Sequence, residues 1–235
     1  MKKVVITQSN YIPWRGFFDL INVADVLVLY DDVQYTRRDW RNRNKIKTAQ
    51  GVQWITIPVE HVSRHQQIRH TRVADPQWNR KHWNTLRVNY GRATFFRTYR
   101  DFFEELYLSP SSVWLSEINH RFLTAIARLL GIRTEFRWSW ELGGEGNRTQ
   151  RLLSICKALG ATDYWSGPRA KAYLDEDAFV REGIRVHYFD FSGYPPYRQL
   201  FGEFVDRLSI IDLIFNEGPR AVEFMKTFDS IVSNG

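Results

Sequence analysis

Residues 8–47 read QSNYIPWRGFFDLINVADVLVLYDDVQYTRRDWRNRNKIK, and this stretch decides the fold. The apolar run Val4–Thr7 before it predicts a buried strand that ends in a polar turn. A short apolar helix, Phe17–Val23, follows the turn, and Val26–Tyr30 predicts a second buried strand. Two parallel strands need a crossover connection of about this length, so the segment predicts a parallel strand–helix–strand unit.

Polar side chains gather where the two predicted strands end. Parallel strands bring both polar ends to one edge of the sheet, and open α/β sheets bind ligands at that carboxyl edge. The helix start in such a unit also presents free N–H groups to an anion. We therefore expect one crevice that draws on both strand ends: Gln8, Asn10, Trp14, Arg15, Asp31, Asp32 and Gln34.

A basic segment begins beside this crevice. It carries six cations within eleven residues, opposed only by Asp39: Arg37, Arg38, Arg41, Arg43, Lys45 and Lys47. Tyr35 and Trp40 lie among them. Arginine suits bidentate phosphate binding and a ring can stack on a base, so the segment fits a nucleotide diphosphate or an RNA backbone. A solvated loop is the alternative, and Asn42 and Asn44 favour a specific site.

The composition of the chain limits the kinds of ligand and partner that the protein can have. The chain has 235 residues, enough for a substantial core, and its net charge of +7 favours an anionic partner, with a solvated basic surface as the alternative. The single cysteine, Cys156, excludes an internal disulfide and reads as a core residue. His61, His65 and His70 match no usual zinc spacing, so we expect no metal site, and the sequence specifies no cofactor. Without an apolar run of about 18 residues, we expect a cytoplasmic protein that does not insert into a membrane.

The rest of the chain alternates strands and helices. Further predicted strands are Val52–Val59, Ile68–Val73, Ile132–Trp138, Thr162–Trp165 and Ile184–Phe189. Further predicted helices are Gln77–Tyr90, Phe95–Leu106, Val113–Leu130, Gln150–Leu159, Asp175–Glu182 and Ile210–Phe215, with Asn147 or Thr149 capping the fourth. This order predicts one α/β domain over residues 1–235. Its sheet is mainly parallel and Rossmann-like, with helices on both faces and a helical insertion near 77–131.

Three later features add candidates to the site. Ser166 and Gly167 end the strand Thr162–Trp165, so they fall on the same carboxyl edge. His82, on a predicted helix, is either a general acid or base or a packed residue. Tyr197 and Gln199 lie in an aromatic–proline loop that forms either a pocket wall or a structural corner.

With these residues in view, the chain resembles the WbqC-like family, which is named after a protein of O-antigen gene clusters. The matching segments are Gln8–Phe18, Asp31–Tyr35, Trp40–Lys47, Lys81–His82, Ala161–Pro168 and Leu208–Asn216. Ser9 stands where the family typically has proline, and Tyr194 stands where many members have the histidine of a His-Pro pair. The resemblance implies a bacterial protein of surface-polysaccharide biosynthesis that modifies a sugar or sugar nucleotide, with an acyl or aminoacyl group as the group attached.

The leading hypothesis is therefore a transferase that acts on a nucleotide-linked sugar or glycan precursor. Phosphate would be bound by Arg15, Arg43 and Lys45, and hydroxyl or amino groups by Asn10, Asp31, Asp32 and Gln34. The predicted catalytic residues are Asp31, Asp32 and His82, with Asp32 or His82 as the base. The pocket walls would be Trp14, Trp40 and Tyr197. Gln8, Tyr35, Asn44, Ser166, Gly167 and Gln199 complete the predicted binding set. The alternatives are an RNA-binding or tRNA-binding module, or a non-catalytic partner of biosynthetic enzymes.

Overall fold

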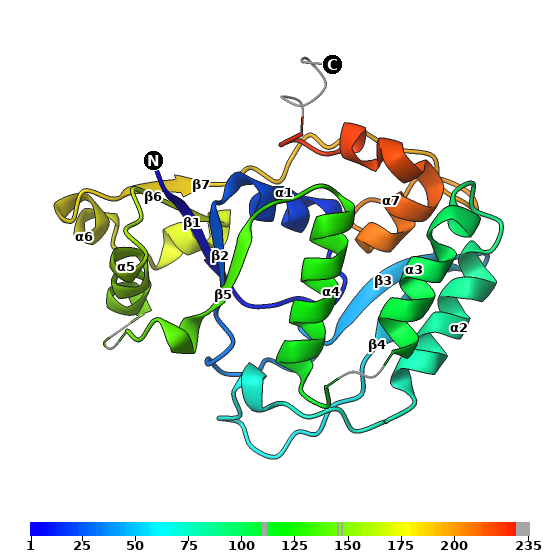
Figure 1. The fold of residues 1–235 in the computed structure, drawn as a ribbon, viewed down its shortest axis with the longest axis horizontal. Helices are drawn as coiled ribbons and strands as arrows, with labels where there is room; N and C mark the ends of the chain where they lie inside the picture. Colours follow the sequence, from blue (N-terminus) through cyan, green and yellow to red (C-terminus); the bar gives the residue numbers. More distant parts are fainter. Residues whose placement is uncertain (110–111, 145, 147, 229–235) are drawn as a thin grey trace.

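The computed structural model describes residues 1–109, 112–144, 146 and 148–228. Its centre is a five-stranded, all-parallel sheet in the order β5-β2-β1-β6-β7 (Figure 1). The strands are β1 (Lys3–Thr7), β2 (Val26–Leu29), β5 (Glu135–Trp138), β6 (Asp163–Ser166) and β7 (Arg185–Tyr188). The register pairs Val4 with Val26 on one side of β1 and with Tyr164 on the other.

Helices cover both faces of this sheet, as the sequence predicts. Val5 and Leu27 belong to one buried core, whereas Val4 and Val26 belong to another, because successive side chains of a strand point to opposite faces. Figure 1 shows α5 and α6 on one side and α1 and α4 on the other. The helices are α1 (Arg15–Val23), α4 (Leu115–Leu129), α5 (Arg148–Ala158), α6 (Glu176–Arg181) and α7 (Ile210–Glu217).

The order of the strands creates a switch point beside β1. From β1 the chain runs to β2 and β5 on one side, and then returns to place β6 and β7 on the other. The carboxyl ends of β1 and β6 therefore adjoin where the direction of winding reverses. Ligands of open α/β sheets bind in the crevice at such a point.

The connection between β2 and β5 holds a hairpin and a group of helices. The hairpin is β3 (Arg43–Thr48) with β4 (Gly51–Thr56), and the helices α2 (Trp78–Tyr90) and α3 (Phe96–Leu108) precede α4. Trp83, Phe103 and Phe122 of these helices share one core with Leu27 of the sheet and Phe215 of α7. That residues 77–131 form a subdomain of a single domain stays a prediction.

Local predictions succeed for the helices and fail in two places. Every predicted helix is present, with ends shifted by at most two residues. Helix α5 starts at Arg148, so Thr149 lies inside it and does not cap it. The alternative cap, Asn147, lies outside the described residues. The predicted strand Ile68–Val73 is wrong. Ile68–His70 is a 3-10 helix (η1) instead, because the Gln67 carbonyl accepts from His70 N and Thr71 Oγ1. Strand β3 was not predicted, because its charged residues obscure the alternation of buried and half-buried side chains along its first part.

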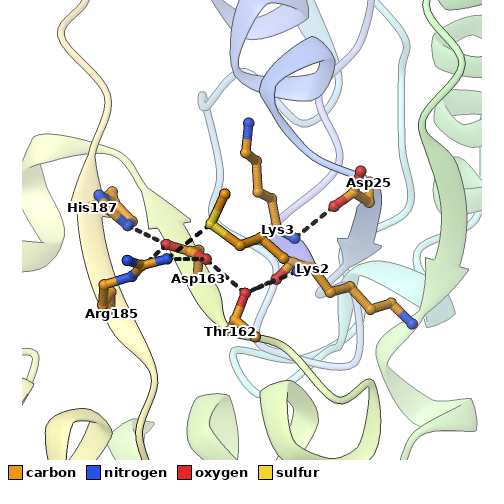
Figure 2. Close-up of polar contacts among 8 residues, drawn as sticks. Lys2, Lys3, Asp25, Thr162, Asp163, Arg185 and His187 are labelled. Carbon is orange, nitrogen blue, oxygen red and sulfur yellow. Dashed lines mark hydrogen bonds and ion pairs between the residues drawn. The ribbon is translucent and has the colours of Figure 1, made fainter.

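The opposite, amino-terminal edge of the sheet is closed by a buried carboxylate. Figure 2 shows Asp163 accepting hydrogen bonds from Arg185 Nε (3.0 Å), His187 Nε2 (2.7 Å) and Thr162 Oγ1 (2.7 Å). The hydrogen bonds from Arg185 hold the pKa of Asp163 well below its usual range. Asp163 therefore ties β6 to the edge strand β7 as a carboxylate, away from the predicted site.

We expect Asp163→Ala to lower the free energy of unfolding by about 2 kcal/mol, because several donors lose one charged acceptor. Urea denaturation would measure the loss. Asp101→Ala is the matched control, since Asp101 is 84% exposed in its ion pair with Arg100 and such surface pairs contribute little. Equal effects of the two substitutions would contradict this role for Asp163.

Candidate functional site

The turn that follows β1, residues 8–16, is held in an unusual shape. Ile12 is fully buried and has φ of +38°, a left-handed conformation that β-branched residues rarely adopt. Asn44 Nδ2 holds it by donating to the carbonyls of Tyr11 (3.0 Å) and Ile12 (2.9 Å). At Gly16, a Cβ atom would come within 2.4 Å of the Trp14 ring, so glycine is required there. The turn is therefore held both by Asn44 from outside and by the close packing of Trp14 on Gly16 within it.

Arg41 is the second support of this turn. Its Nη1 donates to the carbonyls of Gln8 (3.1 Å) and Ser9 (3.0 Å) and to Asn10 Oδ1 (2.6 Å). Burial lowers the pKa of Arg41 from its ordinary value. Its Nε is buried and has no hydrogen-bond partner among the described residues. Arg41 thus brings a guanidinium from the basic segment to the end of β1.

A cavity of 430 Å³, here called the sheet-edge pocket, lies at the carboxyl ends of the central strands. Thr7 and Gln8 line it from β1, Tyr30 from the end of β2, and Ser166 and Gly167 from β6. These residues place the pocket at the switch point. Three of the predicted binding residues, Gln8, Ser166 and Gly167, are thereby brought together.

The sheet-edge pocket is strongly cationic. Arg41, Arg148 and Arg169 line it, and its lining includes no carboxylate among the described residues. The Arg148 guanidinium lies 4.5 Å from the centre of the Tyr173 ring, another lining residue. Cations in a low-dielectric cleft attract and concentrate anionic ligands. The chemistry of the lining therefore fits a ligand with one or more phosphate or carboxylate groups.

The two predicted acids lie behind this pocket, not on its surface. Asp31 is fully buried and accepts from Ser9 N (2.8 Å) and from Ser116 Oγ. Burial raises the pKa of Asp31. Asp32 accepts from Ser139 Oγ (2.6 Å) and pairs with Arg151. Asp31 therefore supports the turn, and a catalytic role for either carboxylate stays a prediction.

Asp32 is nevertheless linked to the pocket wall through its ion pair with Arg151. The guanidinium of its partner Arg151 lies 4.9 Å from the centre of the Tyr30 ring, and Tyr30 lines the sheet-edge pocket. Asp32 thus orients Arg151 against the wall.

A smaller cavity of 140 Å³, the Trp pocket, is lined by a different part of the turn. It gathers four of the predicted binding residues, together with Pro13 and Arg207: Asn10, Trp14, Trp40 and Asn44. The Arg207 guanidinium lies 5.1 Å from the centre of the Trp14 ring. The expected single crevice is therefore divided, because Gln8 lines the sheet-edge pocket whereas Asn10 lines the Trp pocket.

The basic segment lines a third cavity of 220 Å³, the Arg pocket. It contains the predicted residues Tyr35 and Arg43 beside Arg37 and Arg38. The predicted Lys45 lies on the β3–β4 hairpin, with its Nζ 5.2 Å from the centre of the Trp54 ring. Cations of this one segment therefore line different cavities, because Arg41 lines the sheet-edge pocket whereas Arg37, Arg38 and Arg43 line the Arg pocket.

His82 is a packed histidine. Its Nε2 donates to the Thr56 carbonyl (3.1 Å), so its Nδ1 accepts from Tyr11 Oη (2.8 Å). Burial lowers the pKa of His82 to about 4, and the ring is neutral at pH 7. His82 lines none of these three cavities. An acid–base role for it stays a prediction.

The remaining candidates hold the C-terminal segment or lie exposed. Arg15 Nη1 donates to the Pro195 carbonyl (2.7 Å), and Tyr197 Oη donates to a buried aspartate, Asp212 (2.8 Å). Gln199 Nε2 donates to the carbonyl of residue 205 (2.9 Å). Gln34 is exposed. Phosphate binding by Arg15 and a pocket wall at Tyr197 stay predictions.

Arg148 lines the sheet-edge pocket but was absent from the predicted set, although a signal for it existed. Arg148 opens α5, and a helix that follows a parallel strand starts at the carboxyl edge. Arg169, which also lines the pocket, follows Ser166, Gly167 and Pro168, and the sequence indicates it as a cation at a helix start where a ligand phosphate could lie. Tyr173 and Arg207 had no comparable signal, because their places depend on the path of loops.

Neither a metal centre nor a membrane span is found in the described part of the chain. No three His, Cys, Asp or Glu side chains there are grouped so that they could hold a metal ion. Among the described helices, none is both long enough and apolar enough to cross a membrane.

Comparisons with known proteins identify one family and one relative. The model of the WbqC-like protein family matches residues 8–224. An uncharacterized protein of Mycobacterium tuberculosis, Rv1507c, is 48% identical over 227 residues, which cover 96% of this chain and 98% of that protein. No solved structure matches the chain. The chain belongs to the WbqC-like protein family.

Proposed function

We propose that this protein is a transferase that acts on a nucleotide-linked sugar or a related anionic glycan precursor in bacterial surface-polysaccharide biosynthesis. The observation that carries the proposal is the sheet-edge pocket, where Arg41, Arg148 and Arg169 surround the switch point of a parallel sheet. Such a crevice is where open α/β sheets bind nucleotides, and arginine binds phosphate in a bidentate manner. The resemblance to proteins of O-antigen loci supports the choice of a sugar substrate.

In this proposal the arginines bind the diphosphate and the edge residues hold the acceptor sugar. An amino or hydroxyl group of the sugar attacks the carbonyl carbon of an acyl or aminoacyl donor. A new C–N or C–O bond forms, the bond to the donor's leaving group breaks, and the acceptor's proton passes to a base. Of the two predicted bases, Asp32 is favoured over His82, because its partner Arg151 packs on the pocket residue Tyr30.

Thermal unfolding with a ligand panel tests the substrate class. The panel holds nucleoside diphosphates, nucleotide sugars, ATP with magnesium, acyl-coenzyme A and bulk tRNA. A ligand at 100 times its dissociation constant stabilises the folded state by about 2.7 kcal/mol. We expect the largest rise in unfolding temperature with nucleotide sugars. A panel without any shift would contradict the proposal and favour a non-catalytic partner protein.

Arg148→Gln is expected to weaken binding of a nucleotide sugar by roughly tenfold to a hundredfold, the range for hydrogen bonds to a charged group. Arg148 is exposed, so the fold should survive the substitution. Isothermal titration calorimetry would measure the affinity. The matched control is Arg97→Gln, since Arg97 is an exposed residue of α3 outside the sheet-edge pocket. Equal affinities of the two variants would remove Arg148 from the site.

One observation favours RNA binding as a second function. Trp40 and Trp54, each 39% exposed, have ring centres 5.2 Å apart, and Arg43 lies 4.2 Å from the centre of the Trp54 ring. Paired aromatic rings with cations form a platform on which unpaired bases stack. A shift with tRNA that moderate salt removes, and that Trp54→Ala abolishes, would support this function. The two functions combine if an aminoacyl-tRNA is the donor.

A further inference from the structure

The Arg pocket is a cavity of its own. It lies between the basic segment and the residues that follow β4, and its volume is 220 Å³. None of the described residues that line it also lines the sheet-edge pocket or the Trp pocket. Consecutive residues mark the division, because Arg41 lines the sheet-edge pocket whereas Asn42 and Arg43 line the Arg pocket. A ligand here does not compete for space with one at the switch point.

The charge of the Arg pocket is positive. Arg37, Arg38 and Arg43 line it, and its described lining includes no carboxylate. The nearest acid in the sequence, Asp39, is engaged elsewhere, since its Oδ1 accepts from Trp40 N (2.7 Å) and its Oδ2 lies 3.7 Å from Arg41. Three guanidinium groups, with no carboxylate among the described lining residues, form a site suited to an anion.

One of these guanidinium groups is fixed in place. Arg43 packs over the Trp54 ring at 4.2 Å and donates through Nη2 to the Arg38 carbonyl. An arginine that is already ordered loses less conformational entropy when it binds a ligand. The Arg43 side chain is therefore preorganised to bind an anion.

Two polar atoms of the lining residues lack partners. Asn42 is only 6% exposed; its Nδ2 donates to the Ile57 carbonyl (2.8 Å), but its Oδ1 has no partner among the described residues. Arg43 Nε likewise has none in that part of the chain. Buried polar atoms are normally hydrogen-bonded, and each exception requires an explanation. A ligand with a hydroxyl donor for Asn42 Oδ1 and an anionic oxygen for Arg43 Nε would explain both unpaired atoms.

The size and the ring surfaces limit the ligand further. The volume lies below the roughly 300 Å³ at which pockets for drug-sized ligands begin. The rings of Tyr35 and His61, 6.4 Å apart, add aromatic surface to the lining. A phosphorylated single sugar ring combines the anion, the hydroxyl donors and the small size.

We propose that the Arg pocket is a second binding site, specific for a phosphorylated monosaccharide. The site is independent of the proposed transferase reaction, because it has its own lining and its own cations. It would recognise the sugar phosphate by itself, as a free metabolite or as the end of a longer glycan precursor.

Calorimetric titration with glucose 1-phosphate tests the site, with inorganic phosphate and glucose as the comparison ligands. We expect glucose 1-phosphate to bind at one site and more tightly than either comparison ligand. Arg37→Gln and Arg43→Gln are each expected to weaken its binding at least tenfold. Arg37 is exposed, so that variant tests the charge without disturbing the core.

Arg97→Gln, on α3, is the control and is expected to bind glucose 1-phosphate as the wild type does, and Arg148→Gln reports separately on the sheet-edge pocket. A loss in Arg148→Gln with normal binding in Arg37→Gln would place the ligand at the switch point and overturn the proposal. Equal binding of inorganic phosphate would overturn the specificity for a sugar. Absence of binding at millimolar concentration would overturn the site, while leaving the transferase proposal to its own ligand panel.

Discussion

Replacing Asp31 with alanine is expected to lower the free energy of unfolding by about 4 kcal/mol, because two buried donors then lose their acceptor at a cost of roughly 1–3 kcal/mol each. Those donors are Ser9 N–H, at 2.8 Å, and the hydroxyl of Ser116. The fully buried site gives neither donor access to water. Urea denaturation, with the midpoint and the slope both compared with wild type, would measure the loss.

Asp31→Asn is the matched control. Its Oδ1 can still accept from Ser9 N, and its Nδ2 can donate to Ser116 Oγ, so we expect a loss of only about 1 kcal/mol. If alanine and asparagine destabilise the protein equally, the hydrogen bonds are not the source of the effect. If Asp31→Asn stays folded but loses turnover, the charge of Asp31 acts on the chemistry as well as on the turn.

His82 and Asp212 are expected to give opposite dependences of stability on pH. Burial lowers the pKa of His82 to about 4, below its ordinary 6.5, so the folded state binds fewer protons there. Its contribution is present above pH 6.5 and is lost as pH falls towards 4. Burial raises the pKa of Asp212 from 3.8 to about 6, so the folded state binds more protons there. That contribution is present below pH 3.8 and is lost as pH rises through 6.

Each contribution amounts to about 3 kcal/mol over its range, since one pKa unit corresponds to about 1.4 kcal/mol. In the wild type the two slopes largely cancel between pH 4 and 6. His82→Gln should therefore make stability fall as pH rises through this range, and Asp212→Asn should make it rise. Both replacements are neutral and can keep hydrogen bonds to Tyr11 and Tyr90.

Urea midpoints at intervals of half a pH unit, expressed as the difference between each variant and wild type, would isolate the two groups. The variant that carries both substitutions should return the flat profile. Parallel profiles for wild type and His82→Gln would show that burial does not lower the pKa of His82. Such profiles would also support His82 as a candidate general acid or base.

The sequence was sufficient for the sheet and for the edge at which the polar ends of its strands gather. The apolar runs around Val5 and Leu27 are buried on both sides, a property typical of parallel strands, and both runs became central strands. Gln8 and Ser166 were expected at one edge and both line the sheet-edge pocket. These properties follow from periodicity and from the ends of local elements, which neighbouring residues specify.

Which side chains reach a cavity was decided by the tertiary structure. Asp31 ends a strand as predicted, yet Ser116 from α4 and Ser9 from the turn enclose it. Along the basic segment, Arg41 and Arg43 carry the same charge two residues apart but line different cavities. The direction of a side chain depends on the local path of the backbone, and its burial depends on segments that pack there from far along the chain. Composition and spacing contain neither, so the sequence gathered into one crevice the residues that the fold distributes among three cavities and the core.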